Sequence, residues 1–182
     1  MSKITAIIGS PRKNGNCEAI VGKMIEAAEA AGNTVEVFRM NQIPAKGCQA
    51  CMGCKKKSGM CIVKDELTPV LESVKNADSL ILATPDYFGQ PTAQFRIFQD
   101  RTYGFIDGTF QCTFAPKKFV TVTTCATGYD GALKITADIE GVMQNFFKCE
   151  SMGSITYSEA QNGPAADNAE VMAKAEELGK KL

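Results

Sequence analysis

Five short apolar runs alternate with amphipathic stretches of helical periodicity, and this alternation limits the folds that are open to the chain. Strands that alternate with helices are joined by right-handed crossovers, which build a parallel sheet with helices on both faces. We therefore expect an α/β protein with a doubly wound parallel sheet of five strands. The expected strands are 3–8, 34–38, 79–83, 119–124 and 152–157.

The expected strand order is 2-1-3-4-5, which is the flavodoxin-like order. At 182 residues the chain fits one domain, residues 1–182, and a cysteine-rich loop at about 40–64 is inserted after strand two. The segment 102–117 has no clear helical or strand periodicity and is expected to be an irregular connecting segment. Five helices are expected. Three of them are 17–31, 132–147 and 165–181. A fourth begins at Asp65 or Glu66 and continues past Val74, and a fifth has Pro91 in its first turn and runs to Arg101.

The loop after strand one has the composition of a phosphate site. In such sheets ligands bind beyond the carboxyl ends of the strands, where the strand order reverses. There Ser10, Arg12, Asn16 and Cys17 precede or open a helix, so a hydroxyl, a guanidinium, an amide and backbone N–H groups converge. The loop has neither the dinucleotide nor the triphosphate fingerprint, so one terminal phosphate suits it. The alternative is a polar turn with an Asn cap.

The loops after strands three and four can hold a flat ring. The first contains an aromatic pair between a rigid proline and a permissive glycine, and the second contains small residues that allow close backbone approach. Each is weak alone, since a Tyr-Phe pair often plugs the edge of a core. Together the three loops describe a mononucleotide pocket, for which FMN is the natural candidate. The candidate residues are Pro85, Asp86, Tyr87, Phe88 and Gly89, then Thr124, Cys125, Ala126, Thr127 and Gly128.

Four cysteines lie within fourteen residues, at Cys48, Cys51, Cys54 and Cys61. This spacing lets four thiolates surround a compact inorganic core, which indicates an iron–sulfur cluster. A zinc site is one alternative, although its cysteine pairs usually come from separated turns. Free or paired thiols are the other. The lysines at 55–57 would favour thiolates and offset an anionic cluster, or simply belong to a solvated loop.

Composition excludes several function classes. The chain has no histidine, so Ser-His-Asp and Cys-His catalysis are unavailable, and we assign no catalytic side chain. Twenty basic residues balance twenty acidic ones, so nucleic-acid binding is not expected. No apolar run approaches membrane-spanning length, and eight cysteines fit reduced thiols or metal ligands, so we expect a cytoplasmic protein without a membrane partner. The four cysteines outside the motif are expected to be buried small hydrophobes: Cys17, Cys112, Cys125 and Cys149.

Three segments resemble the iron–sulfur flavoproteins within the NADPH-dependent FMN reductase family. They are Gly9 to Arg12 with Gly15-Asn16, the cysteine run up to Asp65-Glu66, and Pro85 to Gly89 before Gln94 and Asp100-Arg101. The resemblance implies that the loop after strand one holds the FMN phosphate, that Pro85, Tyr87, Phe88 and Gly89 border the isoalloxazine ring, and that 124–128 closes the pocket. Position 17 more often carries Thr or Ser in this family, and position 86 an apolar residue.

The resulting hypothesis is an FMN-dependent oxidoreductase that passes electrons between FMN, a [4Fe–4S] cluster and a redox partner such as NAD(P)H, a ferredoxin or a quinone-like acceptor. One alternative is a plain NAD(P)H-dependent FMN or quinone reductase with unfilled cysteines, and another is a zinc-stabilised binding module. We also expect a homodimer or homotetramer, because the cysteine loop leaves from the edge of the sheet and the aromatic-rich segment 102–116 could form a contact surface. That segment could instead fold onto its own core.

Overall fold

The computed structural model describes residues 1–56, 59–115 and 117–182. Its parallel strands follow the order β2-β1-β3-β5-β6, and a short β4 pairs antiparallel with β3. Counted along the parallel strands alone, this is the predicted order 2-1-3-4-5, so the flavodoxin-like fold is confirmed. The strands are β1 (Lys3–Ile8), β2 (Thr34–Arg39), β3 (Ser79–Tyr87), β4 (Gln90–Pro91), β5 (Lys118–Cys125) and β6 (Glu150–Ser158).

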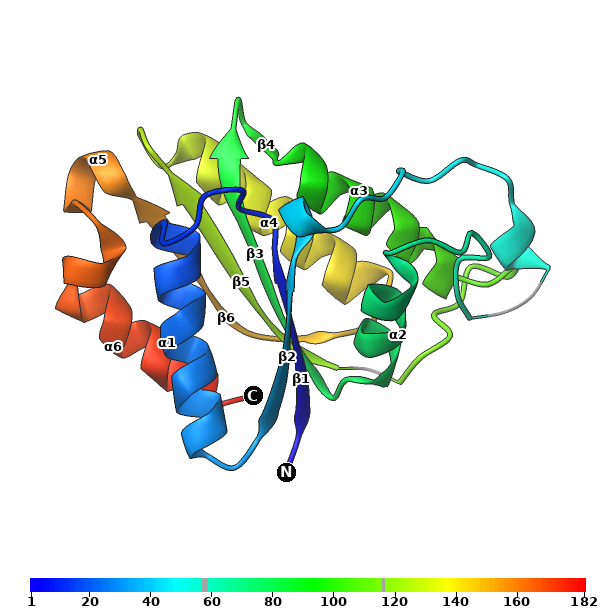
Figure 1. The fold of residues 1–182 in the computed structure, drawn as a ribbon, viewed down its shortest axis with the longest axis horizontal. Helices are drawn as coiled ribbons and strands as arrows, with labels where there is room; N and C mark the ends of the chain where they lie inside the picture. The colour runs from blue at the N-terminus through cyan, green and yellow to red at the C-terminus, as the bar shows by residue number, and fades with distance from the viewer. Residues whose placement is uncertain (57–58, 116) are drawn as a thin grey trace.

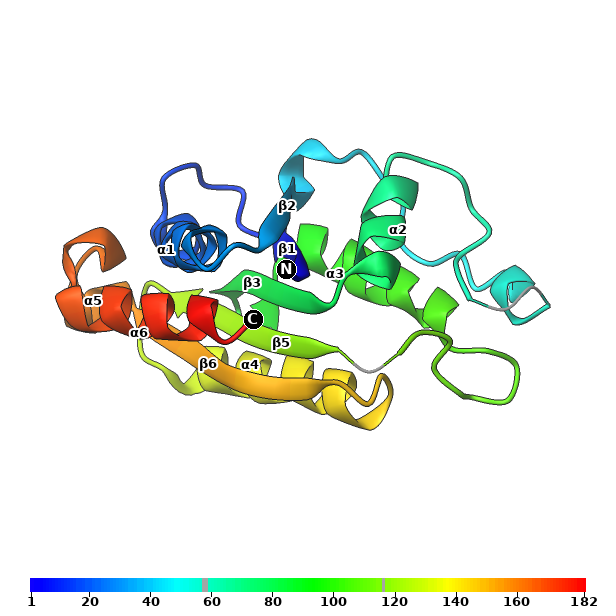
Figure 2. The ribbon, with the colours of Figure 1, turned by 90° about the horizontal axis from the view of Figure 1, so that it is seen from below.

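Helices cover both faces of the sheet (Figures 1 and 2). One face carries α1, α5 and α6, and the other carries α2, α3 and α4. The helices are α1 (Asn16–Ala30), α2 (Thr68–Asn76), α3 (Ala93–Arg101), α4 (Asp130–Asn145), α5 (Glu159–Asn162) and α6 (Ala169–Lys180), with short 3-10 turns at η1 (Met40–Gln42), η2 (Gly53–Lys55), η3 (Thr102–Phe105) and η4 (Ala165–Asp167).

Two apolar cores flank the sheet because its central strands bury both faces. Ile7 and Leu80 face the core under α2, α3 and α4, whereas Ile81 and Val120 face the core under α1 and α6. Near-continuous apolar strands of this kind are typical of parallel sheets. Among the described residues, no helix combines the length and apolarity needed to cross a membrane.

The chain between β3 and α3 differs from the prediction. Residues 84–90 are not simply a loop, because β3 continues to Tyr87 and turns back through β4. Pro91 pairs with Asp86 in this hairpin and does not lie in the first turn of a helix. Instead α3 starts at Ala93, where the Thr92 hydroxyl accepts a hydrogen bond from the Phe95 N–H and caps the helix. The predicted helix at 165–181 is likewise divided into η4 and α6.

The aromatic segment after α3 folds largely onto its own core. Phe105 is 1% exposed, and its ring meets those of Phe114 and Phe147 edge-on at 5.2 and 6.4 Å between centroids. Tyr103 and Phe110 remain exposed. Of the two alternatives for 102–116, Phe105 and Phe114 therefore follow the one in which the segment folds onto its own core, because Phe147 supplies the apolar partner that they need. Position 116 lies outside the described residues.

Helices α1 and α6 approach so closely that a glycine is required between them. A methyl group on Gly179 of α6 would lie 2.3 Å from the Met24 carbonyl oxygen. We expect Gly179→Ala to lower the free energy of unfolding by about 1–3 kcal/mol through overpacking. Gly22→Ala in α1 is the matched control, since no described atom lies within 4 Å of the added methyl group. This control should gain up to about 1 kcal/mol from helix propensity. Urea unfolding measures both, and equal losses would contradict the close approach.

Candidate functional site

A pocket opens at the carboxyl ends of β1, β3 and β5, where the strand order reverses. Ten of the fourteen residues predicted for a cofactor line it together, so the structure gathers three loops that are distant in sequence. The lining is Ser10, Arg12, Gly15, Asn16, Cys17, Pro85, Asp86, Tyr87, Thr124, Cys125, Ala126 and Glu159. Phe88, Gly89, Thr127 and Gly128 are not among the described residues of this lining.

The phosphate-loop candidates surround the start of α1. Within the described chain no side chain caps this helix, so its first N–H groups are available to an anion. The Ser10 hydroxyl accepts a hydrogen bond from the Arg12 N–H at 3.3 Å, which leaves the hydroxyl proton free to donate. The Arg12 side chain is 72% exposed and can turn toward a ligand. This donor set fits a phosphate.

Glu18, in the first turn of α1, fixes the backbone conformation of the loop after β1. Its carboxylate accepts a hydrogen bond from the Asn14 N–H at 2.7 Å, where Asn14 has the left-handed φ of +55°. The carboxylate also pairs with the Arg39 guanidinium. The Asn14 hydrogen bond and the Arg39 pair lower the pKa of Glu18. Glu18 therefore stays ionised and stabilises a loop conformation that Asn tolerates better than most residues.

Cys17 is buried beside the pocket, where its thiol contacts a residue of another loop. The Cys17 sulfur lies 3.1 Å from the Thr124 hydroxyl oxygen, in a hydrogen bond that joins the loops after β1 and β5. Burial raises the pKa of the Cys17 thiol to about 12, although the Thr124 hydrogen bond acts in the opposite direction. A neutral thiol with this partner is a structural link, so the backbone N–H of Cys17 is the group left for a phosphate.

Asp86 closes the β3–β4 turn. Its carboxylate accepts a hydrogen bond from the Gly89 N–H at 2.6 Å. It also lies so close to the start of α4 that a methyl group on Gly131 would meet it at 2.2 Å. Tyr87 is half-exposed at the pocket, whereas Phe88, with a φ of +57°, is fully exposed. Asp86 thus holds the aromatic turn at the pocket edge.

The loop after β5 contributes only its first residues to the pocket. Cys125 is buried, and its thiol donates to the carbonyl oxygens of Thr127 and Tyr157 at 3.5 Å each. Burial raises the pKa of the Cys125 thiol. The Ser158 hydroxyl also donates to the Thr127 carbonyl oxygen, which ties the rest of the loop back to β6. These contacts explain why the loop beyond Ala126 leaves the pocket lining.

Glu159 is a pocket residue that the sequence did not indicate. Its carboxylate accepts a hydrogen bond from the Asn16 amide at 3.0 Å and lies 3.9 Å from the Arg12 guanidinium. The Asn16 amide oxygen in turn accepts from the Ala165 N–H at 2.9 Å. Glu159 opens α5, and only the pairing of β6 with β5 brings it beside the first loop. No local sequence signal marks such a contact.

The four cysteines of the motif line a second cavity. Cys54 is buried, Cys61 is partly buried, and Cys48 and Cys51 are exposed. Left-handed backbone at Ala50 and Met52, with φ of +52° and +56°, winds the loop between the cysteines so that they face one space. Position 57, one of the three lysines expected to favour thiolates, lies outside the described residues.

Four thiols of this kind can hold either a zinc ion or an iron–sulfur cluster. In the part of the chain that is described, no three Cys, Asp or Glu side chains stand close enough to hold one metal ion. Tetrahedral zinc with Zn–S bonds of about 2.3 Å requires sulfurs within about 4 Å of one another. In a [4Fe–4S] cluster each of the four thiolates would bind a different iron. The described lining of the cavity also contains no carboxylate, which suits an anionic cluster.

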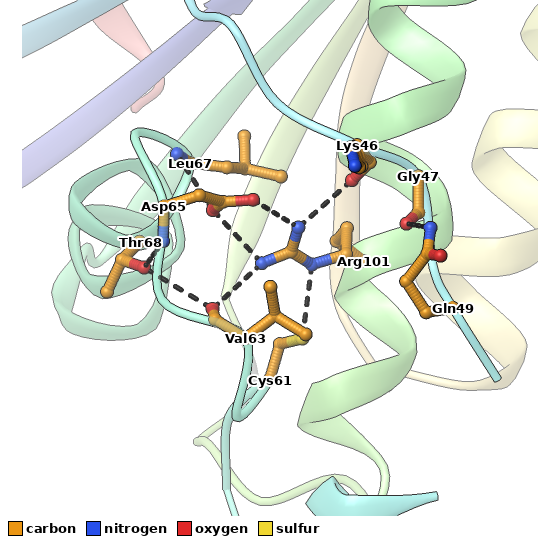
Figure 3. Close-up of polar contacts among 9 residues, drawn as sticks. All are labelled: Lys46, Gly47, Gln49, Cys61, Val63, Asp65, Leu67, Thr68 and Arg101. Atoms are coloured by element: carbon orange, nitrogen blue, oxygen red, sulfur yellow. Dashed lines mark hydrogen bonds and ion pairs between the residues drawn. The ribbon is translucent and has the colours of Figure 1, made fainter. Parts of the chain in front are cut away.

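Arg101, the last residue of α3, anchors the cysteine loop (Figure 3). Its guanidinium forms a two-pronged ion pair with Asp65 at 2.8 and 3.1 Å and contacts the Cys61 sulfur at 3.1 Å. The hydrogen bond from Arg101 lowers the pKa of Asp65. The Asp65 carboxylate also accepts from the Leu67 N–H just before α2. One ion pair therefore joins α3, the cysteine loop and α2.

The 3-10 turn η3 supports the loop from the other side. The Lys55 ammonium donates to the Tyr103 carbonyl oxygen at 2.8 Å and lies 3.5 Å from the centre of the Tyr103 ring. It also donates to the Ile106 carbonyl oxygen. A methyl group on Gly104 would lie 2.4 Å from the Cys61 backbone nitrogen, so glycine is needed for this contact. The cysteine loop is held in place before any cofactor enters.

The two sites lie on different sides of the molecule (Figures 1 and 2). The loop after β1 lies near α1 at one side, and η2 of the cysteine loop projects at the opposite side, beyond the end of α3. The first turn of α3 contacts the loop after β1 through the Thr92 hydroxyl, which donates to the Gly9 carbonyl oxygen at 2.8 Å. Its last residue, Arg101, reaches the cysteines. The two ends of α3 thus contact the loops of the two different sites.

Known proteins resemble the chain in sequence and in fold. It is 40% identical over 101 residues to an iron–sulfur flavoprotein of Methanosarcina thermophila, covering 55% of this chain and 52% of that relative. It is 33% identical over 100 residues to an iron–sulfur flavoprotein of Methanocaldococcus jannaschii, covering 55% and 51%. The chain spans about half the length of these curated relatives.

A solved structure and a family profile extend the comparison over more of the chain. The NAD(P)H:quinone oxidoreductase from Methanothermobacter marburgensis has a TM-score of 0.73 over 98% of this chain and 94% of its own, at 14% identity, which shows a shared fold. Residues 2–162 match the family described as NADPH-dependent FMN reductase. The resemblance to iron–sulfur flavoproteins is thereby confirmed, and the chain belongs to the NADPH-dependent FMN reductase family, a family of flavin-dependent oxidoreductases.

Proposed function

We propose that the chain binds FMN in the pocket at the carboxyl ends of the strands and a [4Fe–4S] cluster at the four cysteines, and that it passes electrons between these groups and an external redox partner. The observation that carries this proposal is the presence of two separate, chemically different pockets in one chain of this family. One has the donors of a phosphate site, and the other is lined by four thiols.

The residues around the first pocket suit FMN. The uncapped start of α1, the Ser10 hydroxyl and the exposed Arg12 guanidinium supply donors for one phosphate. Tyr87 and Pro85 on one side and Thr124 to Ala126 on the other offer flat and small surfaces for the ring. Asp86 is engaged by the Gly89 N–H, so its carboxylate serves the turn.

The residues around the second cavity suit a cluster. Cys48, Cys51, Cys54 and Cys61 would be the ligands, and Arg101 and Lys55 supply positive charge at the same place. When both groups are bound, the flavin exchanges two electrons with a donor or acceptor and the cluster carries one electron at a time. The protein's part is to hold the two groups and their surroundings. NAD(P)H, a ferredoxin or a quinone-like molecule would be the partner.

A plain NAD(P)H-dependent FMN or quinone reductase is the second candidate. It is favoured by the exposure of Cys48 and Cys51, which leaves two of the four thiols open to solvent. In that case the cysteine loop would be a structural appendage whose thiols stay free. A zinc-stabilised binding module has less support, because the family is one of oxidoreductases.

The separation of the sites supports a homo-oligomer. An α-helix of nine residues is about 14 Å long, and the sites lie beyond the two ends of α3. A second copy that packs across the carboxyl ends of the strands would bring its own cysteine site closer to this flavin pocket. We propose a homodimer or homotetramer on this ground.

Removing the guanidinium of Arg12 tests the phosphate site. Arg12→Ala should weaken FMN binding about tenfold to a hundredfold, because a charge-assisted contact contributes roughly 1.5–3 kcal/mol. Lys13→Ala is the matched control, since it removes one positive charge from the same loop but not from the pocket lining. Quenching of FMN fluorescence on titration measures both affinities. Equal affinities for Arg12→Ala and the unmodified chain would reject the site.

Single serine substitutions test the ligand set. Replacing Cys48, Cys51, Cys54 or Cys61 should remove the cluster absorbance and iron but leave the FMN, because the flavin pocket and the cysteine cavity have no described residue in common. Cys112→Ser is the control, since Cys112 does not line that cavity. Iron analysis and spectra on anaerobically prepared protein decide it. The ligand assignment is wrong if Cys112→Ser and Cys54→Ser lose iron alike.

Sedimentation at micromolar concentration tests the oligomer. We expect a dimer or tetramer, because electrons would otherwise have to cross about the length of α3 within one chain. A monomer at every concentration would remove the path between neighbouring copies. The measurement should be made with both cofactors bound, since the loops that hold them lie where the copies are expected to meet.

A further inference from the structure

We propose that Arg101 is the positioning residue of the cysteine site: it fixes both ends of the cysteine run and donates a hydrogen bond to the Cys61 sulfur that raises the reduction potential of the cluster. The inference deepens the proposed function and depends on it for the cluster, but not for the hold on the loop. Arg101 is 1% exposed, at the last position of α3.

The carbonyl contacts of Arg101 lie on both sides of the cysteine run. One terminal nitrogen donates to the Lys46 carbonyl oxygen at 3.0 Å, two residues before Cys48. The other donates to the Val63 carbonyl oxygen at 3.0 Å, two residues after Cys61. Figure 3 shows both carbonyl groups directed at the same guanidinium. One side chain therefore fixes where the loop enters and where it leaves the site.

The remaining donors meet Asp65 and Cys61. The two terminal nitrogens donate to the two Asp65 carboxylate oxygens, and the Nε donates to the Cys61 sulfur at 3.1 Å. An arginine has five N–H donors in a planar fork, and these contacts account for all five. A lysine at this position would keep the charge but could not reproduce the fork, so charge and geometry can be separated by experiment.

The contact with Cys61 has a consequence for electron transfer. A hydrogen bond donated to a ligand sulfur stabilises the more negative, reduced state of a cluster more than the oxidised state. Losing this donor should therefore lower the reduction potential of the cluster. Losing the carbonyl contacts should loosen the loop and reduce the amount of cluster that it retains.

Asp65 provides a way to separate this role from simple support of the fold. Asp65→Asn removes the ion pair that links α3 to the start of α2 but leaves Arg101 able to reach Cys61, Lys46 and Val63. If Arg101 only stabilised the fold, Asp65→Asn and Arg101→Lys would change the cluster alike. If Arg101 positions the sulfur, the potential should respond to Arg101→Lys alone.

The experiment compares Arg101→Lys and Asp65→Asn with Arg96→Lys, the matched control on the same helix. Arg96 is exposed and contacts the side chains of Gln99 and Asp100. Iron and sulfide per chain, the potential from an EPR-monitored titration, and hydrogen–deuterium exchange at 61–65 in iron-free protein are measured. Arg101→Lys should retain less iron, show a lower potential and exchange faster. Arg96→Lys should have the iron content, potential and exchange rate of the unmodified chain. Asp65→Asn should have the same cluster potential as the unmodified chain.

Unchanged iron content and potential in Arg101→Lys would overturn the proposal, and so would an equal shift of potential in Asp65→Asn. If Arg101→Lys does not fold, the side-chain ¹⁵N spectrum of arginine in the unmodified protein gives the answer. Cluster loading should then alter the Arg101 Nε–H signal and leave that of Arg96 unchanged, and no change at Arg101 would overturn the proposal. If the unmodified chain binds no iron, the proposed function is wrong. Hydrogen–deuterium exchange at 61–65, compared between the unmodified chain and Arg101→Lys, would still test whether Arg101 fixes the cysteine loop.

Discussion

Helix α3 is the constraint on which both candidate sites depend. Its N-cap, Thr92, donates to the Gly9 carbonyl oxygen and accepts from Phe95, and the close packing of Phe95 leaves no room for a side chain at Gly9. The phosphate loop is therefore built on the first turn of this helix. Its last residue, Arg101, holds the cysteine loop. A nine-residue helix thus fixes the positions of two pockets that the sequence places far apart.

The two sites are held by different physical means. The pocket at the carboxyl ends of the strands depends on backbone geometry, with a left-handed Asn14 fixed by Glu18 and a β3–β4 turn closed by Asp86. The cysteine cavity depends on charged side chains, because the loop around it has little regular structure and is held by the buried Arg101 and the partly buried Lys55. Losing one partner of a buried ion pair costs stability, so we expect substitutions at Arg101 or Asp65 to destabilise the fold around the cysteine loop, whatever their effect on a bound cluster.

Much of the fold could be predicted from the sequence, since strand order follows from the alternation of strands and helices and from crossover handedness. The β3–β4 hairpin was missed because Pro85 and Pro91 favoured a loop and a helix start, whereas pairing across Asp86 and Pro91 decides the structure. Glu159 was missed because only strand pairing brings it to Asn16. The resemblance marked Arg101, but its contacts with Cys61 and Asp65 are tertiary and leave no periodic signal. The sequence left the positions of Phe105 and Phe114 open, because an aperiodic segment does not show which side of it faces a core.

The central claim is that one chain holds both a flavin and an iron–sulfur cluster. Quantitation of flavin, iron and acid-labile sulfide in protein prepared without oxygen tests it most directly, together with the visible absorbance spectrum. The account predicts FMN and a [4Fe–4S] cluster in equal amounts, with a broad cluster absorbance that is lost on exposure to air. Flavin alone with four free thiols, or zinc in place of iron and sulfide, would contradict it.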